Sequence, residues 1–256
     1  MAPYHKTNFL FLLLGIVLLW AVYFQGLSVF FLPAFALVYL LVVGYGSWDI
    51  QLHFHFKTFN KADADQKYVA ITFDDGPTEY TPRVLDILEK HKVKAAFFCI
   101  GENIEKHPEI LKQIHASGHI IGNHSYGHGY FFDFLNAKGM IAETDKTDAL
   151  IEKLIGKKPI FFRPPYGITN PAVKKTVQRK NYKAIGWSIR SMDTVNKNTE
   201  SVSNKVISNL HPGGIVLFHD SHERIAQILE QTLEEISDNG YKVLSPDQLL
   251  NLKPYD

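Results

Sequence analysis

The chain has 256 residues, of which 46% are apolar, and its 27 Lys and Arg nearly balance its 26 Asp and Glu. This length suits one globular domain with an additional segment, and a net charge of +1 does not indicate the basic surface that nucleic-acid binding needs. We therefore expect no nucleic-acid partner, and no pattern indicates a protein partner. The single cysteine, Cys99, lies in an apolar run and is expected to be a buried thiol.

Residues 9–46 carry no charged side chain, and only Gln25 and Ser28 interrupt them as clearly polar residues. A membrane crossing takes about 20 apolar residues, and the apolar part of a signal peptide has about 7–15. The run is too long for either, so we predict two transmembrane helices, 8–24 and 28–45, hinged near Gly26. A buried soluble hairpin is the alternative, which the absence of a polar face disfavours. Residues 1–46 are thus predicted to anchor the protein in the cell membrane.

Two crossings place both ends of the chain on the same side of the bilayer. Lys6 precedes the first predicted helix, and Lys57, Lys61 and Lys67 follow the second, whereas the hinge has no cation. The positive-inside tendency then favours the cytoplasm for both ends, but with so few charges the face of the membrane stays open.

Residues 47–66 have a mixed pattern with a polar end and are predicted to be a linker. Strand-like and helix-like segments alternate through residues 67–256. The predicted strands are residues 68–73, 94–100, 119–123, 159–162, 183–187, 214–218 and 241–244. The predicted helices are residues 81–90, 108–117, 136–155, 171–179, 199–210 and 224–237. This alternation indicates an α/β domain with a parallel sheet, and about seven repeats in this length favour a closed or nearly closed (β/α) barrel.

The first predicted strand ends at two adjacent carboxylates, Asp74 and Asp75, before Gly76 and Pro77 turn the chain. A solvated turn is the simple interpretation, since Asp and Gly are ordinary turn residues. Acids at a strand end also lie where parallel barrels place their chemistry. In an extended chain the two side chains point in opposite directions, which would allow them different tasks.

The third predicted strand is followed by His124 and His128. If this segment is one helical turn, both histidines point the same way and suit one metal ion; otherwise they are ordinary surface histidines. Two histidines and one carboxylate form a familiar three-ligand set with a position left open. Either Asp74 or Asp75 could be the third ligand, and the other would be free to act as a base.

Two later loops carry further candidates. The segment 162–167 contains Arg163 between a strand and two prolines, which could also simply stiffen the loop. The strand 214–218 ends at His219, a possible proton donor. His222 is interpreted as a surface histidine rather than a ligand.

The motifs 72–77, 124–128, 163–167 and 217–219, in this order, resemble the NodB-homology polysaccharide deacetylases, carbohydrate esterase family four, over residues 67–250. The resemblance implies a distorted barrel and a metal-dependent hydrolase that removes N-acetyl groups from amino sugars of a polysaccharide or oligosaccharide. The carbohydrate and the lipid bilayer are then the expected partners. The expected cofactor is a divalent metal ion, zinc in the first place, with cobalt or another divalent ion as alternatives.

The resemblance also implies a role for each matching residue. It makes Asp74 the catalytic base, His219 the catalytic acid, and Asp75, His124 and His128 the metal ligands. Arg163 would orient the base, the Tyr166 backbone N–H would stabilise the oxyanion, and Asp193 would support His219. Leu217 and Trp187 would line the substrate pocket. The chain departs from the family pattern at Ser188, Arg190 and Thr194, where many members have Asp, Asp and Trp.

Three other hypotheses remain. The first is a deacylase or deformylase of a lipid-linked sugar at the membrane surface. The second is a non-catalytic carbohydrate-binding homologue, and the third is a membrane interaction protein whose soluble part is incidental.

Overall fold

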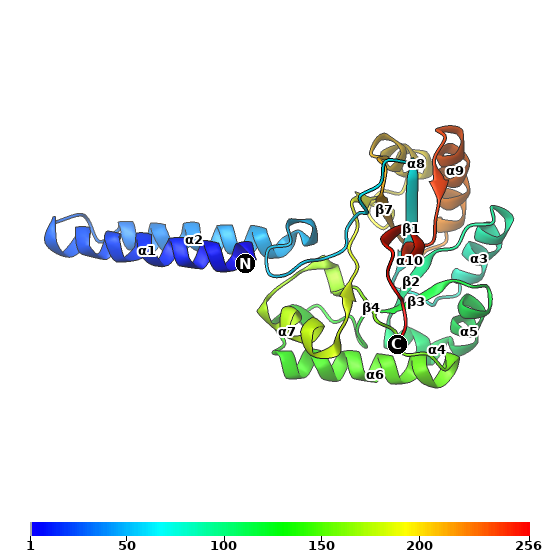
Figure 1. Ribbon diagram of the computed structural model, residues 1–256, viewed down its shortest axis with the longest axis horizontal. Coiled ribbons are helices and arrows are strands. Elements are labelled where there is room, and N and C mark those ends of the chain that lie inside the picture. The colour runs from blue at the N-terminus through cyan, green and yellow to red at the C-terminus, as the bar shows by residue number, and fades with distance from the viewer. Residues whose placement is uncertain (1) are drawn as a thin grey trace.

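The computed structural model describes residues 2–256, in which a helical hairpin projects from one side of an α/β domain (Figure 1). The hairpin consists of α1 (Pro3–Phe24) and α2 (Phe31–Trp48), and Gly46 is its one buried residue. Both helices are long and apolar enough to cross a membrane. The two predicted helices are confirmed, although α1 begins five residues earlier than expected and α2 begins and ends three residues later.

The domain is built on one sheet whose paired strands are all parallel, with the order β5-β4-β3-β2-β1-β7-β6 and β8 beside the start of β1. The strands are β1 (Tyr68–Asp74), β2 (Ala96–Cys99), β3 (Ile120–Asn123), β4 (Phe161–Phe162), β5 (Lys183–Ala184), β6 (Ile189–Arg190), β7 (Gly214–His219) and β8 (Lys242–Val243). The predicted fold class is confirmed as a distorted parallel half-barrel. Within residues 2–256, no strand pairing joins β5 to β6, so the barrel stays open there.

The segment predicted as a linker covers this opening. The Phe59 N–H donates to the Ala184 carbonyl at 2.9 Å, and the Gly186 N–H donates to the Phe59 carbonyl at 2.9 Å. Asn60 packs so closely on Gly186 that a Cβ there would lie 2.0 Å from the Asn60 Oδ1. Residues 54–62 are therefore part of the domain's architecture.

Helices follow most strands and surround the sheet (Figure 1). They are α3 (Thr81–Lys90), α4 (Gly101–Lys106), α5 (Pro108–Ala116), α6 (Ala137–Ile155), α7 (Pro171–Lys180), α8 (Thr199–Ser208), α9 (Ile225–Asp238) and α10 (Pro246–Leu250). Three 3₁₀ turns lie at Ile50–Leu52, Phe132–Phe134 and Pro165–Gly167. The six predicted helices are present. The short helices α4 and α10 were not predicted, because five or six residues show no helical period.

The alternation of β1 decides which residues reach the site. Phe73 stacks on Phe97, with ring centroids 4.8 Å apart, in the core between the sheet and its helices. Thr72 and Asp74 point to the opposite face, because successive side chains of a strand alternate. That face is the concave interior of the half-barrel, where Phe98 and Leu249 of α10 belong to a second apolar cluster.

Candidate active site

The carboxyl ends of β1 and β7 bring the two predicted proton-transfer residues into one row, because Asp74 is the register partner of His219. The adjacent acids do not point apart as expected. Asp75 has a left-handed backbone (φ 73°), so the chain is not extended there. As a result the Asp74 Oδ2 and the Asp75 Oδ1 lie 3.6 and 3.7 Å from the same atom, His124 Nε2.

His124 and His128 lie in an irregular loop and not in the helical turn considered from the sequence. Ser125 (φ 64°) and His128 (φ 46°) have left-handed backbones, which replace the helix in bringing the two rings together. The ring centroids are 4.7 Å apart, and His128 Nε2 lies 3.7 Å from the Asp75 Oδ1. One ligand atom each from Asp75, His124 and His128 lies within 4.8 Å of the others.

The orientation of His124 and the protonation of His128 suit a divalent cation. His124 Nδ1 donates to the Arg163 carbonyl at 2.7 Å, which leaves the Nε2 lone pair directed at the carboxylates. Burial and the neighbouring His124 lower the pKa of His128 to about 4, so its imidazole is neutral at neutral pH. Neutral imidazoles and a carboxylate are the donors that zinc-like ions bind. The residues present therefore fit a divalent metal ion.

Arg163 is wholly buried beneath the cluster and fixes Asp74. Its Nη1 donates to the Asp74 Oδ1 at 2.7 Å and to the Thr72 Oγ1 at 3.0 Å, and Nε and Nη2 donate to the Ile185 and Gly186 carbonyls. Burial lowers the pKa of Arg163, and the charge of Asp74 opposes this change. The pair leaves the Asp74 Oδ2 directed toward the cluster.

His219 is held by Asp193. The His219 Nδ1 donates to the Asp193 Oδ1 at 2.9 Å, and the His219 backbone N–H donates to the Asp193 Oδ2 at 2.7 Å. Burial by itself lowers the pKa of His219, but the hydrogen bond and charge of Asp193 outweigh it and raise the pKa to about 9. Burial by itself raises the pKa of Asp193, yet the bonds from His219 and His222 hold it well below its usual range.

These side chains open into a cavity of about 240 Å³. Its lining residues are Asp74, Asp75, His124, His128, Tyr166, Gly167, Trp187, Arg190, Thr194, Leu217 and His219. Arg163 and Asp193 lie behind this lining. The structure thus places every sequence-predicted site residue in or directly beneath one cavity.

The cavity has one polar and one apolar wall beside the cluster. Tyr166 has a left-handed backbone (φ 57°), and its N–H donates to no other group within residues 2–256. Trp187 and Leu217 pack with Ile50 into a small buried apolar cluster. At Gly167 a Cβ would lie 2.3 Å from the Trp187 ring, so only glycine allows this close approach.

Comparison with known proteins places this site in a family. The family profile described as "Polysaccharide deacetylase" matches residues 61–185. A peptidoglycan-N-acetylglucosamine deacetylase from Bacillus cereus is 36% identical over 218 residues, which are 82% of this chain and 95% of the relative. The chain belongs to the polysaccharide deacetylase family. The chain is therefore a member of a family of hydrolases that act on carbon–nitrogen bonds other than peptide bonds.

Solved structures agree with this polysaccharide deacetylase assignment. A peptidoglycan N-acetylglucosamine deacetylase in complex with an N-hydroxybenzamide derivative superposes with a TM-score of 0.72 at 30% identity, covering 78% of this chain and 95% of that one. A pseudoenzyme of carbohydrate esterase family four from Bacillus anthracis has a TM-score of 0.70 at 28% identity, covering 75% and 68%. The family fold thus occurs with and without activity. Whether a member is active must therefore be argued from its site residues and not from its fold.

Several residues of this polysaccharide deacetylase site were not found from the sequence. His222, interpreted as a surface residue, has a side chain only 14% exposed, and its Nε2 lies 3.2 Å from the Asp193 Oδ2. Asp220 is buried and accepts a hydrogen bond from the Thr81 hydroxyl, and burial raises its pKa to about 7. The one feature of the sequence that could have indicated Asp220 and His222 is that they lie within three residues after His219. Ile50 carried no signal, because it lies in the predicted linker.

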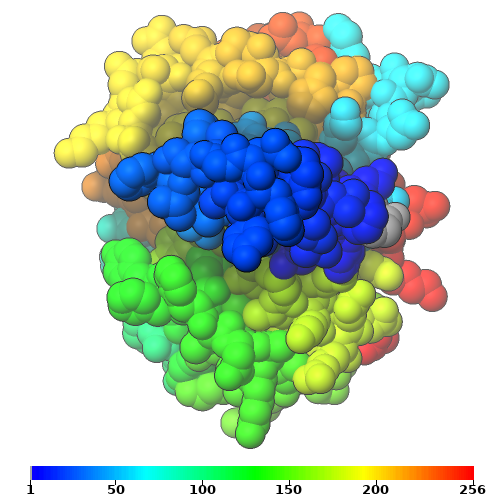
Figure 2. Space-filling model, turned by 90° about the vertical axis from the view of Figure 1, so that its left-hand side faces the viewer, coloured from blue at the N-terminus to red at the C-terminus, as the bar shows by residue number. Residues whose placement is uncertain are grey.

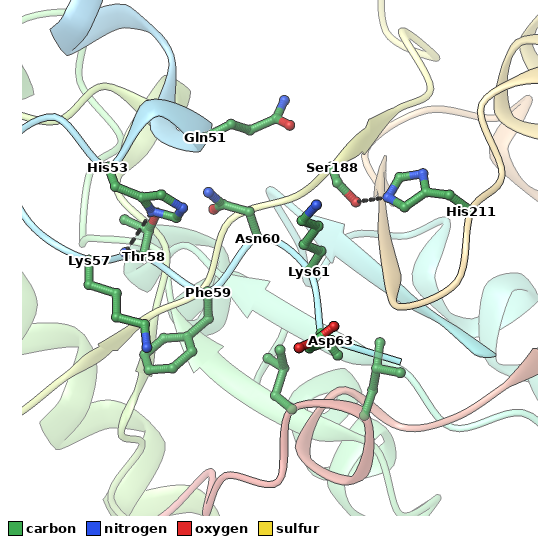
Figure 3. A pocket seen from close by; sticks show the side chains of 13 residues that line it. Gln51, His53, Lys57, Thr58, Phe59, Asn60, Lys61, Asp63, Ser188 and His211 are labelled. Atoms are coloured by element: carbon green, nitrogen blue, oxygen red, sulfur yellow. Dashed lines mark hydrogen bonds between the residues drawn. The ribbon is translucent and has the colours of Figure 1, made fainter. Parts of the chain in front are cut away.

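A second, larger cavity of about 860 Å³ lies beside the segment 51–63 (Figure 3). Its two histidines bond to neighbouring residues of the same cavity wall, since His53 Nδ1 lies 2.8 Å from the Thr58 Oγ1 and His211 Nε2 lies 3.0 Å from the Ser188 Oγ. None of the cavity's lining residues belongs to the metal-ligand cluster. Size alone therefore does not identify the active site of this deacetylase-family chain.

Proposed function

We propose that the chain is a membrane-anchored, metal-dependent deacetylase that removes N-acetyl groups from amino sugars of a peptidoglycan-like polysaccharide. The observation that carries the proposal is the arrangement of the cavity. A three-ligand cluster, a carboxylate held by a buried arginine, and a histidine held by a buried carboxylate all face the same 240 Å³ space.

Asp75, His124 and His128 would hold a divalent ion, with zinc as the proposed metal and cobalt as an alternative. Such an ion, when bound, supplies a Lewis acid that polarises an amide carbonyl and makes water more acidic. The chain's own contribution is to orient His124 through its hydrogen bond to the Arg163 carbonyl and to keep the imidazole of His128 neutral through burial.

Asp74 is proposed as the general base. Because Arg163 occupies its Oδ1, the Oδ2 is the oxygen that faces the cluster and can accept the proton of an attacking water. The oxygen of that water adds to the amide carbon. The Tyr166 N–H, which has no other acceptor among residues 2–256, is proposed to donate to the resulting oxyanion.

His219 is proposed as the general acid. Asp193 keeps it protonated near neutral pH, so its imidazolium can donate a proton to the amine nitrogen as the carbon–nitrogen bond breaks. The products are acetate and the free amino sugar. Leu217 and Trp187 form the apolar wall that would receive the acetyl methyl group.

The peptidoglycan-like substrate is proposed from the names of the relatives and from the site's requirement for an N-acetyl group. Arg190 and Thr194, which stand where many family members have Asp and Trp, line the cavity and are expected to affect substrate choice. A deacylase of a lipid-linked sugar is a second candidate, because the hairpin joins the domain directly beside the cavity. The complete ligand, base and acid set argues against a non-catalytic binding homologue.

Acetate release tests the proposed function. Purified protein would be incubated with peptidoglycan, chitin oligosaccharides and lipid-linked N-acetyl sugars, each with added zinc, cobalt or a chelator. We expect metal-dependent acetate from at least one substrate and none from the Asp74→Asn variant. Equal acetate release by wild type and Asp74→Asn, or none under any condition, would reject the proposal.

Membrane anchoring is tested separately. We expect the protein to stay in the membrane fraction after alkaline carbonate washing, and recovery in the soluble fraction would contradict the anchor. A reporter fused to the C-terminus would identify the face of the membrane on which the domain lies.

A further inference from the structure

We propose that the cavity face of the domain rests on the lipid bilayer, so that the enzyme acts on glycan held at the membrane surface. The docking surface rests on the proposed membrane anchor, and the statement about the glycan rests on the proposed deacetylase activity. The bilayer partner is argued from the length of the hairpin, its attachment and the distribution of exposed apolar side chains.

The hairpin has no excess length with which to hold the domain away from the membrane. α1 has 22 residues and α2 has 18, which at about 1.5 Å per residue gives about 33 and 27 Å. The hydrocarbon core of a bilayer is about 30 Å thick. Trp48 and Tyr45, at the end of α2, are 66% and 67% exposed, as expected of aromatic residues at the membrane–water interface.

The base of the hairpin is joined directly to the domain. The Tyr4 N–H donates to the Phe54 carbonyl and the Thr169 N–H donates to the Ser47 carbonyl, both at 2.9 Å. Ile50, two residues after α2, is buried against Trp187 and Leu217, which line the active-site cavity. The cavity is thus adjacent to the point where the chain leaves the membrane.

The large apolar side chains that the domain exposes are concentrated in a few segments near the cavity. Within residues 53–256 these side chains are Tyr130, Phe131, Phe134, Leu135, Tyr166 and Val195. Tyr166 lines the cavity, and Val195 follows Thr194, which also lines it. Figure 2, seen from the hairpin's side, shows the segments near residue 130 (green) and near residue 195 (yellow) on either side of the hairpin.

We call these six residues the apolar rim. Tyr130 stacks on Tyr166, and Phe131 lies beside Phe134 with ring centroids 6.3 Å apart. Phe131 is 77% and Phe134 84% exposed. A soluble domain gains nothing by gathering its exposed aromatic side chains around one opening, whereas such a patch beside a membrane anchor suits the interfacial layer of a bilayer.

Site-specific fluorescence quenching tests the docking surface on the full chain. The native Cys99 is buried, so single cysteines at Phe134→Cys and Val195→Cys can be labelled with a fluorescent dye. Gln113→Cys is the matched control, because Gln113 is exposed on α5 at the end of the domain away from the hairpin (Figure 1). Each labelled protein is reconstituted in phosphatidylethanolamine–phosphatidylglycerol vesicles containing a phospholipid with a nitroxide on its headgroup.

We expect the nitroxide to quench most of the fluorescence at positions 134 and 195 and to leave the dye at 113 nearly unchanged. Equal quenching at the three positions, or quenching at neither rim position, overturns the proposal. Two rim positions on opposite sides of the hairpin keep the test informative if one variant does not fold.

A kinetic comparison tests the consequence for the substrate. The double variant Phe131→Ser and Phe134→Ser should keep wild-type turnover of a soluble N-acetylglucosamine oligosaccharide. It should lose about tenfold in turnover of a lipid-linked N-acetyl sugar in the same vesicles, as expected when two aromatic rings no longer reach the interface. An equal effect on both substrates overturns the proposal. Absence of acetate from both substrates with wild-type protein would instead reject the proposed function, whatever the quenching result.

Discussion

Replacing Asp193 by asparagine removes one buried negative charge while keeping the shape of the side chain. In the native protein the pKa of His219 is about 9, against 6.5 for an ordinary histidine. This difference corresponds to about 3 kcal/mol in favour of the imidazolium, at about 1.4 kcal/mol for each pH unit. Burial lowers the pKa of His219, so without Asp193 we expect a value at or below 6.5.

The sign of the effect determines the pH range in which it appears. Because the pKa of His219 is raised on folding, its contribution to stability is complete below pH 6.5 and is lost as the pH rises through about 9. In Asp193→Asn this contribution is absent. At pH 7.5 the protonated fraction of His219 should fall from nearly all to about one tenth, which lowers an acid-dependent rate by about tenfold or more.

The pKa is measured by NMR titration of histidine ring protons in chelator-treated protein, with the His219 signal assigned through its loss in His219→Gln. The pH dependence of kcat/KM in the metal-loaded protein gives the functional consequence. His222→Gln is the matched control, because it removes the other histidine that contacts Asp193 and leaves the bond to His219. An unchanged pKa of His219 in Asp193→Asn would refute the reasoning.

Three further substitutions separate the remaining roles. Asp74→Asn should retain metal but reduce kcat by about 10²–10⁴-fold, as loss of a general base does, and normal turnover would remove Asp74 from that role. His124→Ala should lose most of its bound metal in elemental analysis, whereas a wild-type metal content would exclude it as a ligand. Arg163→Ala leaves Asp74 buried without its partner and should lower the free energy of unfolding by about 3–5 kcal/mol, measured by denaturant titration of metal-free protein. A loss below about 1 kcal/mol would show that water replaces the guanidinium.

The predictability of the site from the sequence has a physical basis. Chemistry-bearing residues such as Asp74 and His219 directly follow apolar strands, and parallel strands bring their carboxyl ends to one edge. The sequence pattern is therefore enough to predict that these residues come together in one site. The orientation of Asp75 could not, because it depends on one left-handed backbone angle that a non-glycine residue rarely adopts.

The packing of residues 47–66 against the domain could not be predicted from the sequence either. Phe59 and Lys61 take part in single β-bridges, with Ile185 and Gly214, and an isolated bridge leaves no alternating pattern to detect. The two-residue strand β6 was missed for the same reason. The amphipathic helix α6 was predicted within one residue because its apolar spacing persists over several turns.

The position of Ile50 limits where the membrane anchor could be replaced by another segment in evolution. A gene fusion that exchanged the anchor at the polar run 60–66 would remove Ile50, which packs on the cavity-lining Trp187 and Leu217, and would remove Phe59 from the open side of the barrel. We therefore expect exchangeable anchors to be joined before Asp49. Ile50 and Phe59 then stay with the active site when the anchor is exchanged.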